Sequence, residues 1–249
     1  MGTPYGLEII EDCHTCHHRR EGSFCDLQQE TLRALSAASV VTTYPRGAVL
    51  FVEGQMPKGV WILCEGRIKL TVTSSFGQAR IIRTAETGET LGLAATVLGS
   101  PHALNGETMS RCALRFIKRW DFLRLLKDRA DLRMSVARQL GNQYITACRV
   151  MGSLGVAQSA SERLADLFLN WAGEQGANGT ERAHVDVMFT HEEVAQIIGT
   201  TRETVSRLLR KFKQRQLIEL HGSSLTLCDP KSLAAVSSGS FPIDEGDRA

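Results

Sequence analysis

The chain has 249 residues, of which 43% are hydrophobic and 22% charged, a composition typical of a folded protein with one or two buried cores. Its longest apolar runs, such as Val60 to Cys64, are far shorter than the roughly 18 residues that a membrane-spanning helix needs. No basic stretch followed by an apolar core begins the chain, so a secretory signal is not expected either. These features predict a cytoplasmic protein without a membrane partner, whose seven cysteines are reduced.

The overall net charge of +2 conceals one strongly basic segment. Residues 202–215 contain four arginines, two lysines and one glutamate, for a local charge of +5. Positive charge concentrated on one helix is typical of nucleic-acid binding, and a solvated helix face is the plain alternative.

Residues 42–118 consist of short β-rich runs separated by glycines. Strands are expected at 60–63, 67–73 and 79–84, with Ser74 to Gly77 as a hairpin turn. Regularly spaced short strands predict a jelly-roll or a barrel. The clustered histidine ligands of a cupin-like enzyme are absent, because His102 is the only histidine in this region. We therefore assign no catalytic residue and do not expect an enzyme.

After Trp120 the pattern changes from strands to helices. Apolar residues recur at helical spacing and predict one long amphipathic helix over about residues 131–155. Its apolar stripe would pack either on its own domain or, as the favoured interpretation, against a second copy of the chain. The expected dimer seam consists of Leu132, Val136, Leu140, Ala147, Met151 and Leu154.

The C-terminal part predicts a winged helix-turn-helix. Capping-box patterns at residues 159–162, 190–193 and 200–203 predict three helix starts. Gly199 separates the last two helices, and the second of these carries the basic segment. A short strand at 185–189 and a hairpin of residues 217–220 and 225–227 complete the unit. Residues 237–249 are expected to form a disordered tail.

Side chains in the first turns of the basic helix are candidates for reading DNA bases. Arginine can bond guanine through two atoms, and glutamate can accept from the cytosine amino group. The opposite face, with Val205 and Phe212, would pack in the core. Glu203 has the alternative role of completing a capping box with Thr200. The candidate DNA-binding residues are Arg202, Glu203, Ser206, Arg207, Thr201 and Lys211.

The segment from Thr190 to Leu209 reads THEEVAQIIGTTRETVSRLL and resembles the helix-turn-helix of the CRP/FNR family of bacterial transcription regulators. The order of a β-roll, a long helix and a winged helix is similar to that family over about residues 27–236. The resemblance implies a homodimer that binds palindromic double-stranded DNA and contacts RNA polymerase. Glu203, Ser206 and Arg207 match the pattern of FNR-type members, whereas Arg202 is typical of CRP-type members. Both types imply a TGA core in each half-site.

The family's cyclic-nucleotide motif is altered in this chain. Leu93 stands where nucleotide-binding members have a carboxylate, and residues 103–105, which are Ala, Leu and Asn, offer no cation for a phosphate. An anionic ligand would lose its hydration there without gaining a cationic partner. No cyclic nucleotide is therefore expected.

Three cysteines near the N-terminus, Cys13, Cys16 and Cys25, have the spacing Cys-x2-Cys-x8-Cys. Thiolates at such spacing can ligate an iron–sulfur cluster or zinc. FNR-type oxygen sensors add one β-roll cysteine, so the resemblance implies a [4Fe-4S] cluster that senses oxygen or nitric oxide, with Cys112 as fourth ligand or Cys64 as the alternative. Cys112 falls three residues before the family's usual place. An odd shift on a strand turns a side chain to the opposite face unless a bulge corrects it.

Other signals fit the same regulator. Zinc could take His14, His17 or His18 as a fourth ligand and form a closed structural site, or the cysteines could act as a thiol redox switch. A haem or another small effector in the β-roll, with His102 near it, is a further alternative.

The predicted fold is α+β. Its parts are a cysteine-rich metal-binding segment at 1–26, a cyclic-nucleotide-binding-like jelly-roll sensor domain at 27–128, a dimerisation helix at 129–156, a winged helix-turn-helix at 157–236 and the tail at 237–249.

Overall fold

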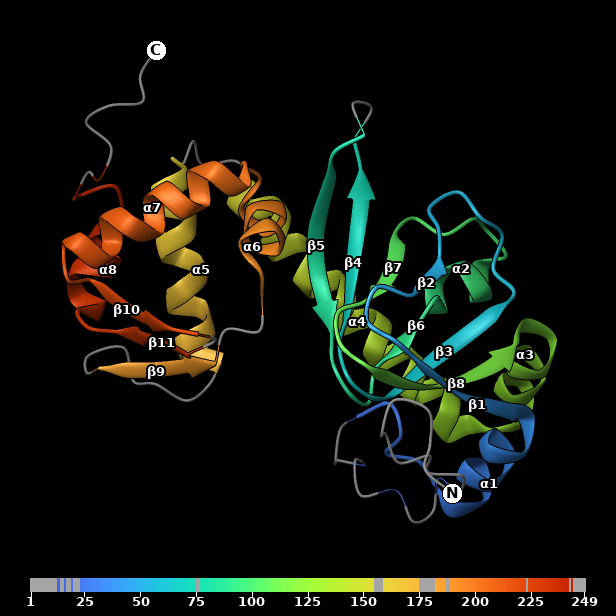
Figure 1. Cartoon of the computed structure of the whole chain (residues 1–249). Helices are drawn as coiled ribbons and strands as arrows, with labels where there is room; N and C mark the ends of the chain where they lie inside the picture. Colours follow the sequence, from blue (N-terminus) through green and yellow to red (C-terminus); the bar gives the residue numbers. More distant parts are fainter. Residues whose placement is uncertain are drawn as a thin grey trace. The chain divides into compact units, whose positions relative to one another are not determined.

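The computed structural model describes residues 13, 16, 19, 23–74, 77–154, 159–174, 182–186, 189–222, 224–241 and 243, with only the backbone for 149–154, 174 and 186. The chain divides into two compact units, residues 1–153 and 154–249 (Figure 1). The candidate zinc ligands His14, His17 and His18 lie outside the described residues. In the described part of the chain, no helix is both long enough and apolar enough to cross a membrane.

The first unit is a β-roll of two antiparallel sheets, as predicted. The order in one sheet is β1 (Ser39–Tyr44), β8 (Cys112–Lys118), β3 (Gly59–Glu65) and β6 (Thr90–Leu91). The order in the other is β2 (Val49–Phe51), β7 (Asn105–Thr108), β4 (Ile68–Thr73) and β5 (Ala79–Ala85). The strands expected at 60–63, 67–73 and 79–84 are confirmed as β3, β4 and β5. Gly77 allows the turn between β4 and β5 because its φ is 78°.

Side chains of β3 and β8 alternate between two cores, since successive residues of a strand point to opposite faces. Leu63 and Leu114 are fully buried in the core between the two sheets. Ile62 and Ile117 face the other way, into a core that the strands form with helices of the same unit. This alternation decides which cysteines can meet.

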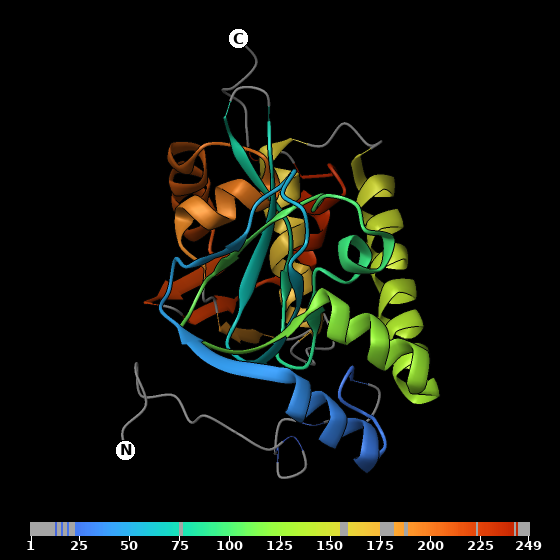
Figure 2. The same cartoon turned by 90° about the vertical axis from the view of Figure 1, so that its right-hand side faces the viewer.

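Four helices accompany the β-roll. They are α1 (Gln29–Ala38), α2 (Leu93–Leu98), α3 (Arg119–Asp128) and α4 (Ala130–Leu154). Figure 2 shows α4, drawn in yellow-green, as one long helix, which confirms the helix expected at 131–155.

The predicted dimer seam of α4 needs a correction. Leu132 is fully buried and Val136 is 6% exposed, both in the core of their own unit, and Leu140 packs against that core. Leu132 and Val136 cannot face a second copy, because the helix uses their face to cover its own sheet, and Leu140 lies partly buried against the same core. Ala147 is exposed, and the side chains of Met151 and Leu154 lie outside those described.

The second unit is a winged helix-turn-helix around one core. Its elements are α5 (Ala160–Glu174), β9 (Ala183–Asp186), α6 (His191–Ile198), α7 (Arg202–Gln214), β10 (Ile218–His221), β11 (Ser224–Leu227) and α8 (Pro230–Ser237). The strands form a sheet of order β10-β11-β9, so the predicted hairpin is confirmed. The strand expected at 185–189 begins earlier, at Ala183, and its described part ends at Asp186, because residues 187 and 188 lie outside the described ones. Ile243, within the expected tail, is buried in the core.

Helix caps define the two helices of the helix-turn-helix. Thr190 and Glu193 form the predicted reciprocal capping box at the start of α6, and Gly199 ends that helix with a φ of 67°. The box predicted at 200–203 is wrong. Thr201, one residue later, caps α7 by accepting a hydrogen bond from the Thr204 amide at 3.2 Å.

Candidate DNA-reading surface and cysteine site

Helix α7 separates a buried face from a polar face. Val205 and Phe212 are fully buried among other apolar residues of the unit, as expected. On the polar side Arg202, Glu203 and Arg207 are exposed, while Ser206 is partly buried. Val205 and Phe212 hold the helix in the core, so the backbone that carries its polar side chains has a fixed position.

The first turn of α7 leaves the Glu203 carboxylate at the surface. Because Thr201 and not Thr200 caps the helix, Glu203 does not occupy the third position of a capping box. Hydrogen bonds to its own backbone and to the Thr201 hydroxyl lower the pKa of Glu203 below its usual range. Thr201 is exposed and Lys211, two turns further along, is half-buried. An ionised carboxylate here can accept a hydrogen bond from a cytosine amino group.

Four cysteines line one small cavity in the first unit. Cys13, Cys16 and Cys25 of the N-terminal segment meet Cys64 of β3 there. Apolar side chains from α1 and β3, including Leu32, also line it, together with Arg19, Gly88 and Arg115. The structure therefore places Cys64 with the three N-terminal cysteines.

Cys112, the favoured fourth ligand, is not among the residues that line this cavity. It is fully buried between the two sheets, where its thiol lies 3.3 Å from the Arg67 carbonyl oxygen. The reason is the alternation of β8: Arg115, three residues further on, faces the cysteine cavity, so Cys112 faces away from it. The place expected for the family's fourth cysteine is thus occupied by Arg115.

Cys64 reaches the cavity from the neighbouring strand. It continues the face of β3 that carries Val60 and Ile62, both buried beneath the helices. The pairing of β3 with β8 shifts register between Leu63 and Glu65, which makes Cys64 the extra residue of a β-bulge. In the sequence, only the alternation of apolar residues in β3 indicated on which face of the strand Cys64 lies.

Burial keeps the thiols of Cys25 and Cys64 protonated in the metal-free protein. Burial raises the pKa of Cys25 to about 12, and the neighbouring Cys64, Cys13 and Cys16 add to the shift. Burial also raises the pKa of Cys64 to about 11, against the opposing charge of Arg115. Reactive redox cysteines usually have lowered pKa values, so this environment is unlike that of a thiol switch.

Arg115 is the cation of the site that sequence analysis missed. Its side chain is only 3% exposed, and its Nη1 donates to the Ser39 hydroxyl at 3.0 Å. Its charge opposes the raised pKa values of both Cys25 and Cys64. A permanent guanidinium charge in this position would stabilise thiolates once protons are lost.

The segment that carries Cys25 is fastened to α4. The Ser135 hydroxyl donates to the Phe24 carbonyl oxygen at 2.9 Å in a buried position. The Asp131 carboxylate accepts from the Gln28 amide at 3.0 Å and from the Thr31 hydroxyl at 2.8 Å. A displacement of Cys25 would therefore strain hydrogen bonds made by the long helix.

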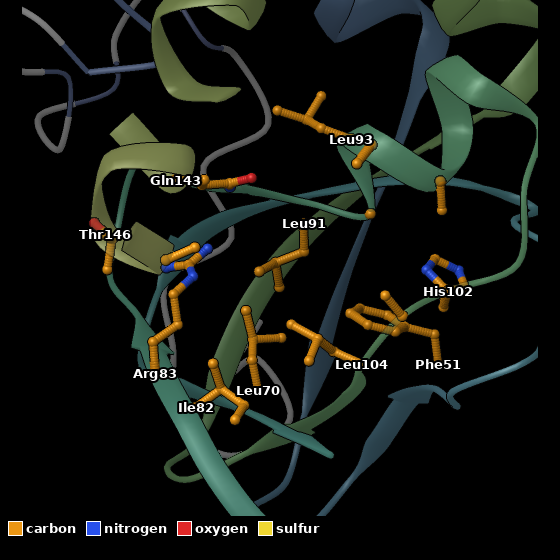
Figure 3. Close-up of a pocket in the computed structure, with 15 residues that line it drawn as sticks. Phe51, Leu70, Ile82, Arg83, Leu91, Leu93, His102, Leu104, Gln143 and Thr146 are labelled. Carbon is orange, nitrogen blue, oxygen red and sulfur yellow. The ribbon is translucent and has the colours of Figure 1, made fainter. Parts of the chain in front are cut away.

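A second cavity, of about 200 Å³, lies inside the β-roll (Figure 3). Phe51 and His102 are stacked at one end, with ring centroids 4.4 Å apart, and Arg83 lies at the other end near Gln143 and Thr146 of α4. Burial lowers the pKa of His102. Arg83 is a cation that sequence analysis overlooked, but it forms an ion pair with Glu89 at 2.7 Å. The lining contains no carboxylate.

Comparisons with known proteins agree with the two units. Residues 41–129 match the model of the cyclic nucleotide-binding domain, and residues 162–236 match that of the Crp-like helix-turn-helix domain. A "CRP-like cAMP-activated global transcriptional regulator" of Mycobacterium tuberculosis is 23% identical over 215 residues, which cover 86% of this chain and 96% of the relative. That relative is named as a transcription regulator, not as an enzyme.

Two solved structures share the fold. FixK2 from Bradyrhizobium japonicum is 19% identical with a TM-score of 0.66, covering 80% of this chain and 96% of the other. The c-di-GMP responsive global regulator CLP of Xanthomonas campestris is 18% identical with a TM-score of 0.69, and the match covers 81% of this chain and 99% of the other. With its nucleotide-binding-type β-roll and its Crp-like helix-turn-helix, the chain belongs to the CRP/FNR family of DNA-binding transcription regulators.

Proposed function

We propose that this regulator binds DNA as a homodimer and that an iron–sulfur cluster held by Cys13, Cys16, Cys25 and Cys64 controls the binding. The observation that carries the proposal is the convergence of these four cysteines, from two distant parts of the chain, on one cavity. Cys64 replaces Cys112 in the ligand set. The signal is oxygen or nitric oxide, and the DNA is a palindrome with a TGA core in each half-site.

The donor set of four cysteines suits a [4Fe-4S] cluster. Four thiolates are the usual ligands of a [4Fe-4S] cluster. In the part of the chain that the structure describes, no three Cys, His, Asp or Glu residues are arranged to hold one metal ion. Tetrahedral zinc with bonds of 2.3 Å requires sulfurs about 3.8 Å apart, whereas a cluster spreads its ligands over four irons. The metal and sulfide content of the protein distinguishes the two.

The chain's own residues supply the rest of the mechanism. A bound cluster would supply reactivity toward oxygen and nitric oxide. Arg115 offsets the negative charge of the thiolates, and the apolar wall with Leu32 and Leu35 excludes water. Ser135 and Asp131 couple the Cys25 segment to α4, so loss of the cysteine anchor would release contacts on that helix.

We place the dimer seam on the opposite face of α4 from the one first expected. Met134 is 61% exposed and Ile145 is 51% exposed, although both are apolar. With Gly141 and Cys148 they recur at intervals of three, four or seven residues, which is the spacing of a two-helix seam. Gly141 has no heavy atom within 4 Å of the position of an added Cβ, which leaves room for a second helix to approach closely.

A second candidate function uses the β-roll cavity. The Mycobacterium tuberculosis relative is named as cAMP-activated, but the cavity here has no carboxylate in its lining, and its Arg83 is paired with Glu89. We therefore favour a small, mostly apolar effector over a cyclic nucleotide at this place. Isothermal titration with cyclic AMP tests the point, and micromolar binding would contradict it.

The decisive experiment is purification without oxygen, followed by iron and sulfide assays and an absorbance spectrum before and after air. We expect about four iron and four sulfide atoms per subunit and a visible band that bleaches in air. Cys64→Ser should abolish the cluster, whereas the matched control Cys112→Ser should retain it. A colourless protein with one zinc per subunit, unchanged by air, would overturn the cluster and leave DNA binding intact.

DNA reading is tested with a pair of variants on α7. Arg207→Ala should weaken binding to a cognate palindrome by about 1–3 kcal/mol and relax the preference at one base pair. Lys213→Ala should weaken binding to all sequences alike. It should also lower, by about one, the number of counterions released on binding, which the salt dependence of the affinity measures. Equal loss on all sequences for Arg207→Ala would refute its role in reading a base.

A further inference from the structure

His191 contacts a residue of the DNA-reading surface from the other helix of the motif. Its Nδ1 lies 3.0 Å from the Ser206 Oγ, a hydrogen bond between the first residue of α6 and the middle of α7. Both side chains are partly buried, whereas Arg202, Glu203 and Arg207 around Ser206 are exposed. Ser206 thus has a hydrogen-bond partner on the other helix of the motif.

The backbone of His191 is held in place from both sides. The preceding Thr190 closes the capping box with Glu193, whose carboxylate accepts from the Thr190 amide at 2.7 Å and from its hydroxyl at 2.9 Å. The His191 side chain lines a cavity of about 90 Å³ with Val194 and Leu209. Its ring nitrogen therefore approaches Ser206 from a fixed base, and the hydrogen bond is not a chance contact of two mobile side chains.

A hydroxyl group has one proton to donate and two lone pairs to accept with. If His191 accepts the Ser206 proton, the serine oxygen can only accept from a base amino group, as on adenine or cytosine. If His191 donates, the serine proton is available to a base acceptor such as thymine O4 or a purine N7. When His191 donates, however, Ser206 keeps both its proton and one lone pair, so only an accepting histidine fixes the direction of hydrogen bonding toward the groove.

We propose that His191 is a specificity-determining residue of this regulator, which positions the Ser206 hydroxyl and, by accepting its proton, restricts Ser206 to accepting a hydrogen bond from one base of the half-site. The inference rests on the base-reading role proposed for Ser206. It makes His191 a positioning residue that acts through Ser206 and needs no contact with DNA of its own.

The test measures base preference and not only affinity. The cognate palindrome is first selected from randomised half-sites with the wild-type protein. Competition binding then compares that palindrome with variants changed at one base pair at a time, for wild type, His191→Phe, Ser206→Ala and the double variant. Phenylalanine keeps an aromatic ring against the cavity but has no ring nitrogen.

We expect Ser206→Ala and His191→Phe to lose discrimination at the same base pair, by roughly three- to tenfold, the range for one hydrogen bond. The double variant should lose no more than Ser206→Ala alone, because both changes remove one interaction. His191→Asn, whose side-chain amide can reach a similar position to Nδ1, should restore the preference. Binding to non-specific DNA and its salt dependence should stay at wild-type values.

Two results would overturn the inference. In the first, His191→Phe leaves the preference at the Ser206 base pair unchanged while Ser206→Ala abolishes it. In the second, His191→Phe weakens all sequences equally and lowers the salt dependence by about one ion, which would make His191 a phosphate contact. A wild-type protein that selects no sequence at all would instead refute the proposed function. Thermal melting of each variant checks that the unit remains folded.

Discussion

The buried cysteine site predicts a loss of stability at alkaline pH in the metal-free protein. Folding raises the pKa of Cys25 from 9.0 to about 12 and that of Cys64 to about 11. Between pH 9.0 and the folded pKa of each thiol, the unfolded chain releases the thiol proton that the folded chain keeps. The stabilisation from each neutral thiol is therefore complete below pH 9 and declines as pH rises toward the folded pKa.

The magnitude follows from the shifts. Each pH unit in this window costs about 1.4 kcal/mol per thiol. At pH 10.5 the loss is therefore about 2 kcal/mol for Cys25 and nearly as much for Cys64. Two such losses are a large part of the stability of a typical domain, which is roughly 5–15 kcal/mol.

The assay is urea unfolding at pH 8 and pH 10.5 under reducing conditions without metal, followed through Trp61 in the first unit. Cys25→Ser does not titrate in this range, so its free energy of unfolding should fall by about 2 kcal/mol less than that of wild type between the two pH values. Equal pH dependence of wild type and Cys25→Ser would refute the buried environment of this thiol.

Three further predictions concern the core, the coupling and the dimer. Phe212→Ala should cost about 3–5 kcal/mol of stability, because the ring is fully buried, and an unchanged urea midpoint for the second unit would contradict the packing. Ser135→Ala leaves the buried Phe24 carbonyl without its 2.9 Å partner, so the cysteine segment should be destabilised by about 1–3 kcal/mol and a bound cluster should be lost faster in air. Ile145→Glu should shift the protein from dimer to monomer in analytical ultracentrifugation, and a mass identical to that of wild type would place the seam elsewhere.

The helix-turn-helix was predictable because its signals are local. A capping box at residues 190–193, a glycine at 199 and a basic amphipathic segment after it specify two helices and the turn between them within about 25 residues. The shift of the α7 cap from Thr200 to Thr201 is the kind of error that local patterns allow. Either threonine could cap the helix, Thr200 by accepting from the Glu203 amide or Thr201 by accepting from the Thr204 amide, and only the turn after Gly199 selects between them.

The face of α4 could not be predicted from its stripe. An apolar stripe indicates that one face of a helix is buried. The same stripe is expected whether that face packs on a sheet of its own chain or on another helix. Leu132 and Val136 are buried in their own unit because α4 packs in the core formed with β3 and α3. That packing leaves Met134 and Ile145 exposed on the other side.

By itself the sequence determined the kinds of elements, their order, the DNA-reading helix and the three N-terminal cysteines, all of which depend on short-range spacing. Only the tertiary structure decided which β-roll cysteine joins them. Strand alternation turns Cys112 into the core between the sheets and turns Arg115 toward the cavity, while β3, paired beside β8, brings Cys64 to the same face. The choice between Cys64 and Cys112 depends on which strands are neighbours and on which face of the sheet each residue lies. Residues some 40 positions apart in the chain become neighbours on one face only when the sheets form.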